Sequence, residues 1–108
     1  MKVEVLRLSR WVHPGLFPTF VKGESVRVIG PEDTDFLGWY PCMIQGRETY
    51  IPNVFLTDGK LNRDYNPTEL RFSVGDVLTV KEIVGGWVLA EDKSGQIGWV
   101  AVECVKSI

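Results

Sequence analysis

The chain has 108 residues, 24% of them charged, with a formal net charge of −2 and a pI near 5.3. This weakly acidic balance gives no general attraction to phosphate backbones or anionic lipid, so we expect neither nucleic-acid nor membrane binding. No apolar run approaches the roughly 20 residues of a membrane span. Charges at Lys2, Glu4 and Arg7 interrupt the apolar stretch that a signal peptide needs, and we therefore expect a cytoplasmic location.

Short strands separated by turns are predicted along the first half of the chain. Alternation predicts a strand over residues 3–8, and an irregular loop rich in proline and glycine follows over residues 9–21. Further strands are predicted over residues 25–29, 39–44 and 48–51, the last two forming a hairpin across residues 45–47.

The second half has the same character. Strands are predicted over residues 77–83, 87–91 and 96–100, with glycine-containing turns between them. No segment has a sustained helical period, so we predict an all-β fold. The turn signal at residues 57–60 is interpreted as the boundary between a first domain, residues 1–57, and a second domain, residues 60–108.

One β-rich pattern occurs twice in the chain. Residues 23–28 and 75–80 each begin with a Gly-acid pair that leads into a β-branched run, and residues 39–42 and 87–90 each begin with a Trp. The blocks 50–56 and 99–105 follow in the same order. Such duplication indicates two small barrels or sandwiches. Because each half has only about 50 residues and so a modest core, we expect the two to pack against each other.

The second half resembles an SH3 domain over nearly its whole length. Leu61–Tyr65 stands in place of the opening motif of that family, Glu69–Phe72 followed by Gly75-Asp76 is similar to its diverging turn, and Gly95–Val100 resembles its closing strand pair. The first half is a looser match from Gly23 to Leu56. The whole chain resembles bacterial proteins with tandem variant SH3-like domains, and the resemblance implies two SH3-like barrels in tandem.

The resemblance also implies a groove in which aromatic rings hold a proline-rich peptide. The residues at matching groove positions are the candidate ligand-binding residues: Trp39, Pro52 and Phe55 in the first half, and Tyr65 and Trp87 in the second. The second groove is degenerate, because Arg63, Ala101 and Cys104 stand where the family has Tyr, Pro and Tyr.

The first half is interpreted as the better groove candidate. Trp11, His13 and Phe17 lie in a loop that could face Trp39, and the acidic loop residues 32–35 could pair with a basic ligand residue. An alternative is that Trp39 and Trp87 cover a junction between the two halves.

Nothing in the sequence indicates an enzyme, a cofactor or a metal site. His13 is the only histidine, which leaves little room for a base beside a nucleophile. Cys42 aligns with Ala90 and is predicted to be buried and unreactive, whereas Cys104 is predicted to be more exposed. Two cysteines are too few for a disulfide framework or a zinc cage, and the acidic loop lacks calcium-loop spacing.

The leading hypothesis is a non-catalytic intracellular module that binds a peptide or a partner protein. One alternative is binding of cell-wall peptides or glycans, as in secreted SH3-like domains. Another is a structural subunit that self-associates through exposed strand edges.

Overall fold

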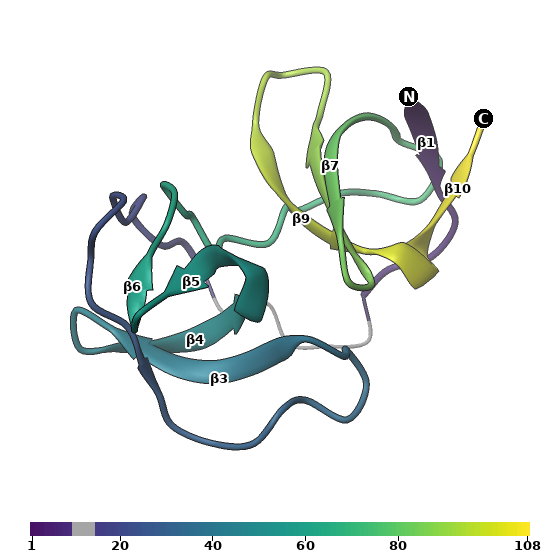
Figure 1. Cartoon of the computed structure of the whole chain (residues 1–108). Helices are drawn as coiled ribbons and strands as arrows, with labels where there is room; N and C mark the ends of the chain where they lie inside the picture. The colour runs from purple at the N-terminus through teal and green to yellow at the C-terminus, as the bar shows by residue number, and fades with distance from the viewer. Residues whose placement is uncertain (10–14) are drawn as a thin grey trace. The chain divides into compact units, whose positions relative to one another are not determined.

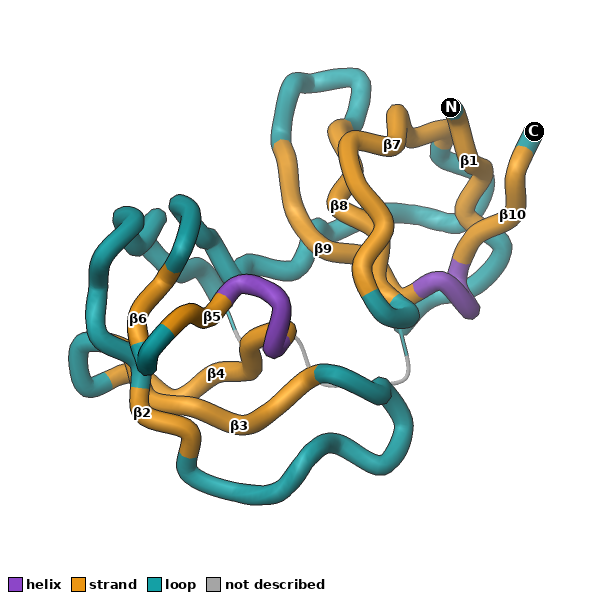
Figure 2. Tube along the Cα trace, viewed as in Figure 1, coloured by secondary structure: helices purple, strands orange, loops and turns teal. Residues whose placement is uncertain are grey.

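The computed structural model describes residues 1–9 and 15–108 and divides the chain into two compact units. The discontinuous unit comprises Met1–Leu16 and Thr68–Ile108, and the central unit comprises Phe17–Pro67. Apart from two single-turn 3₁₀ helices, the described residues form only strands, turns and loops (Figures 1 and 2). The predicted all-β fold is confirmed for these residues, and none of their helices is long and apolar enough to span a membrane.

The discontinuous unit is built on a five-stranded antiparallel sheet in the order β10-β1-β7-β8-β9. Its elements are β1 (Lys2–Val5), β7 (Val77–Val84), β8 (Trp87–Glu91), β9 (Ile97–Ala101), the 3₁₀ helix η2 (Val102–Cys104) and β10 (Val105–Ser107). Strand β1 lies between β7 and β10, so the first and last strands of the chain run side by side (Figure 1). Alternate side chains of these strands form the core, including Val3, Val5, Leu78, Val88, Ala90 and Val100.

The central unit contains a three-stranded sheet and a two-stranded sheet. Its elements are β2 (Arg27–Val28), β3 (Trp39–Ile44), β4 (Arg47–Pro52), the 3₁₀ helix η1 (Asn53–Phe55), β5 (Leu56–Thr57) and β6 (Lys60–Leu61). Isolated bridges join Phe20 to Tyr65 and Ser25 to Lys60. The core of this unit includes Phe20, Val26, Cys42, Ile44, Ile51, Phe55 and Leu61.

Most predicted strands agree with the structure to within two residues. The main differences are at the start of the chain, where β1 ends at Val5, and at residues 25–29, where only Arg27 and Val28 form a strand. The first hairpin turns over Gln45 and Gly46 alone, because Arg47 already pairs with Ile44 in the ladder.

The two units share one hydrogen-bonding pattern at the Gly-acid pair. In the discontinuous unit, the Val5 amide donates to the Asp76 carbonyl and the Val5 carbonyl accepts from the Gly75 amide, both at 2.8 Å. In the central unit, Leu61 makes the same two bonds to the Gly23-Glu24 pair, at 2.8 and 2.9 Å. Strand β1 therefore holds the place in the discontinuous unit that β6 holds in the central unit.

The units differ from the predicted domains of residues 1–57 and 60–108. Strand β1 belongs with the C-terminal residues, and β6 belongs with the residues that precede it. The reason lies in Asp58 and Gly59, which connect β5 to β6 with φ of 52° and 75°. Positive φ at both central residues is the requirement of a type I′ hairpin turn, for which Asp-Gly is a preferred pair. Residues 57–60 are thus a tight hairpin within the central unit.

We predict that Gly59→Ala lowers the free energy of unfolding by about 1 to 2 kcal/mol, because a Cβ is strained in left-handed backbone. Urea unfolding followed by tryptophan fluorescence measures the effect. Lys93→Ala, at an exposed loop position, is the control and should change the free energy by less than about 0.5 kcal/mol. Equal stability of the two variants would contradict the hairpin assignment.

Candidate functional site

Four of the five predicted ligand-binding residues lie in the central unit: Trp39, Pro52, Phe55 and Tyr65. Only Trp87 lies in the discontinuous unit. Tyr65 was predicted to face the second groove with Trp87, but it pairs with Phe20 through two backbone hydrogen bonds of 2.8 Å. Because the type I′ turn directs residues 60–65 into the central unit, Tyr65 joins the groove residues of the first half.

The aromatic residues of the central unit form a closed cluster. The Phe55 and Tyr65 rings meet edge to face, with centroids 5.5 Å apart, and the Tyr65 hydroxyl donates to the Tyr50 carbonyl at 2.6 Å. The Arg63 guanidinium lies 4.2 Å from the centroid of the Phe55 ring. Trp39 is only 5% exposed, and it faces Pro52, which is fully buried, across the β3–β4 ladder. The cluster therefore acts as core in this structure and presents no open aromatic surface.

The loop residues expected to accompany this cluster have other partners or lie outside the described residues. Trp11 and His13 fall outside the described residues, and Phe17 is buried, with the Arg47 guanidinium 4.3 Å from its ring centroid.

The acidic loop that precedes Trp39 uses two of its carboxylates to fold itself. A Glu32 oxygen accepts from the Gly38 amide at 2.6 Å. An Asp33 oxygen accepts from the amides of Asp35 and Phe36, at 3.1 and 2.9 Å. This Asp33 arrangement is typical of Asx turns, in which a carboxylate replaces a backbone acceptor. The two carboxylates thus shape the loop, which leads directly into β3.

Trp87 is placed differently, at the start of β8 and partly exposed. Val88 and Ala90 point into the core, so Trp87 and Leu89 occupy the opposite face of the strand. Directly across the ladder from Trp87 is Ala101, the last residue of β9. Cross-strand partners share a face, so the indole stands beside the small Ala101 side chain.

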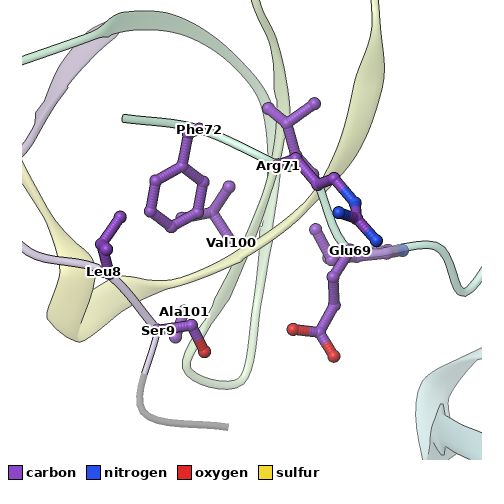
Figure 3. Close-up of a pocket in the computed structure, with 9 residues that line it drawn as sticks. Leu8, Ser9, Glu69, Arg71, Phe72, Val100 and Ala101 are labelled. Atoms are coloured by element: carbon purple, nitrogen blue, oxygen red, sulfur yellow. The ribbon is translucent and has the colours of Figure 1, made fainter. Parts of the chain in front are cut away.

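Ala101 also lines a hollow of about 290 Å³ in the discontinuous unit (Figure 3). The other residues that line it come from the segment after β1, from the segment before β7 and from β9: Leu8, Ser9, Glu69, Leu70, Arg71, Phe72, Trp99 and Val100. Figure 3 shows Leu8 and Phe72 on one side of the hollow and the charged groups of Glu69 and Arg71 on the other. The lining thus offers apolar surface together with one charge of each sign.

Two small residues, Ser9 and Ala101, are among those that line the hollow. Ser9 follows Val5 by four positions, as Tyr65 follows Leu61, so the matching hydrogen bonds of Val5 and Leu61 place Ser9 where the central unit has a tyrosine. Ala101 stands where the central unit has Pro52. Sequence reasoning did not identify Ser9 as a site residue, because its role appears only once β1 is placed in this unit.

One wall of the hollow is fixed to β9 by close backbone contact. The Leu70 amide donates to the Trp99 carbonyl and the Trp99 amide donates to the Thr68 carbonyl, each at 3.0 Å. A Cβ on Gly98 would lie 2.6 Å from the Leu70 nitrogen, so only glycine permits this approach. Trp99 is buried at 4% exposure. Glu69 is therefore held on a fixed backbone beside the hollow.

Both cysteines are buried. The prediction for Cys42 is confirmed, since burial raises the pKa of its thiol to about 12 and keeps it protonated. The prediction for Cys104 is wrong: it is fully buried, because it ends η2 at the position that Phe55 holds in η1. Within the described ranges, no group of three or more His, Cys, Asp or Glu side chains is arranged to hold a metal ion.

We predict that Gly98→Ala lowers the free energy of unfolding by about 1 to 3 kcal/mol, because the added Cβ overpacks against the Leu70 backbone. Hydrogen exchange at the Leu70 amide should accelerate in the same variant. Gln96→Ala, at an exposed position of the preceding turn, is the control and should change stability by less than about 0.5 kcal/mol. Unchanged exchange at Leu70 in Gly98→Ala would contradict the close approach.

We predict a pH dependence of stability from Cys42. The pKa of its thiol rises from 9.0 in the unfolded chain to about 12 in the folded chain, because burial disfavours the thiolate. The Cys42 thiol therefore contributes fully to stability below pH 9. As the pH rises from 9 towards 12, the free energy of unfolding falls by about 1.4 kcal/mol per pH unit. Cys42→Ala, which copies Ala90, should lack this loss. If the free energies of unfolding of the wild type and the variant change by the same amount between pH 8 and pH 10.5, the prediction is refuted.

The C-terminal half of the chain matches a known family. Residues 59–108 match the family described as Variant SH3 domain. The match is to a binding domain, and no catalytic family is identified. No curated protein and no solved structure shows significant similarity to the chain. Most of the matched residues belong to the discontinuous unit, whereas residues 59–67 belong to the central unit. The chain thus contains a variant SH3 domain at residues 59–108.

Proposed function

We propose that the chain is a non-catalytic module that binds an extended peptide segment of a partner protein on the surface around Trp87. The variant SH3 domain at residues 59–108 supports a peptide- or protein-binding role. The observation that carries the proposed location is the partly exposed Trp87 indole beside Ala101, which lines the hollow. The burial of both thiols supports a role without covalent chemistry.

The surface offers three kinds of contact to a peptide. The Trp87 indole supplies flat apolar area and an N–H group able to donate to a peptide carbonyl. The hollow between Leu8, Phe72 and Ala101 suits an apolar side chain. Glu69 and Arg71 stand at the opposite side, where a charged ligand group would find an opposite charge.

We further propose that the central unit is a second barrel of the same kind, with a supporting role. The shared bonds of Val5 and Leu61 to the two Gly-acid pairs support a common architecture. The residues at the groove positions of this unit are buried, namely Trp39, Phe55 and Tyr65. Their burial supports a role in the core of the unit. The proposed pair of SH3-like barrels then has one binding surface, which lies in the discontinuous unit.

Peptide binding should depend on Trp87. We expect members of a proline-rich peptide library, titrated into the full chain, to shift amide signals of Trp87, Ala101 and Glu69 in ¹H–¹⁵N NMR spectra. In Trp87→Ala the affinity for a selected peptide should fall at least about 10-fold, as for an aromatic residue at the centre of an interface.

The matched control is Tyr50→Ala, which removes a half-exposed aromatic ring of the central unit at 48% exposure. This variant should bind the selected peptide with wild-type affinity. Undiminished binding by Trp87→Ala, or signal shifts confined to residues 17–67, would exclude the proposed surface.

A further inference from the structure

Strands β1 and β6 make further matching contacts, in addition to their hydrogen bonds to the Gly-acid pairs. The residue after Val5, Leu6, donates its amide proton to the Cys104 carbonyl at 2.7 Å. The residue after Leu61, Asn62, donates to the Phe55 carbonyl at 2.8 Å. Cys104 and Phe55 each end the 3₁₀ helix of their unit. Each unit therefore has one first-strand position, with the same neighbours on both sides.

The order of elements along the chain shows that these positions are filled crosswise. Strand β1 precedes the central unit in sequence but pairs with β7 and β10 of the discontinuous unit. Strand β6 precedes β7 in sequence but pairs with β5 of the central unit. We infer that the two units have exchanged their first strands within one chain.

The two positions differ in how their strand is attached. Strand β6 is joined to β5 by the two residues Asp58 and Gly59, so it forms a hairpin with its neighbour. Strand β1 has no such connection, because the whole central unit separates it in sequence from β7. Only the position between β7 and β10 thus depends on a strand supplied from far away in the chain.

We propose that the position between β7 and β10 also accepts β1 of a second copy, so that two chains form a reciprocal strand-exchanged dimer. The contacts that hold β1 are complete within the discontinuous unit: Val3 pairs with Leu78 and Ser107, and the Met1 and Lys2 carbonyls accept from the amides of Val80 and Ile108. A second copy offers the same contacts.

Because the contacts are the same, the free energies of monomer and dimer differ mainly in the entropy lost when β1 is brought to its acceptor position. Within one chain, the local concentration of the strand is on the order of millimolar. Intermolecular exchange should therefore become substantial when unfolded chains refold together at protein concentrations in that range. In dilute refolding, β1 should return to its own chain.

A cross-link between two singly substituted chains tests this proposal. Glu4 and Lys106 are partners across the β1–β10 ladder. Glu4→Cys and Lys106→Cys chains are unfolded together under reducing conditions, refolded together at about 1 mM and then oxidised. We expect a disulfide-linked dimer at several times the control yield, with the 4–106 link identified by peptide mass spectrometry.

The matched control mixes Met43→Cys and Glu48→Cys chains, whose substituted positions face each other within the β3–β4 hairpin. Such a hairpin is local, so its two strands should not pair between chains. Wild-type chains, refolded and oxidised in the same way, show how much disulfide-linked dimer forms through Cys42 and Cys104. The double variant Glu4→Cys/Lys106→Cys, refolded dilute, should close the same link within one chain. A 4–106 dimer yield no higher than the control would overturn the proposal.

Discussion

The fold of this chain depends on one tight turn. Asp58 and Gly59 both have left-handed backbone, and together they fold β6 back onto β5. Strand β6 thereby fills the first-strand position of the central unit, and the equivalent position of the discontinuous unit is left for β1. The Val5 and Leu61 hydrogen bonds to the two Gly-acid pairs follow from this choice. A local conformational preference thus determines which distant segments pair.

The same turn at Asp58 and Gly59 also gives the two units different roles. Residues that follow β6 bring Tyr65 into the central unit, where it packs against Phe55 and helps to close the aromatic cluster. Residues that follow β1 bring Ser9 to the matching place in the discontinuous unit, and the hollow beside Ala101 remains unfilled by an aromatic ring. The surface that we propose for peptide binding therefore has a small residue, Ser9, at the position that corresponds in sequence to Tyr65.

Local features of this structure were predictable from sequence, and pairings between distant segments were not. The strand Trp87–Glu91 agrees with its prediction residue for residue, because alternation and the flanking glycines are local signals. The partner of β1 is not a local property: β1 and β6 both alternate charged residues with buried apolar ones, and each could bond to either Gly-acid pair. The Asp-Gly pair at 58–59, interpreted as a domain boundary, also favours a hairpin. The burial of Trp99 likewise depends on residues 68–70, which lie far from it in sequence.

The most direct test of the strand assignment is a set of nuclear Overhauser effects from the first strand in the dilute protein. Placement of β1 between β7 and β10 predicts cross-strand effects from Glu4 to Lys106 and from Val3 to Leu78. Effects from Val5 to Glu24 and Leu56 in their place would show that each unit keeps its own first strand, and would contradict the account.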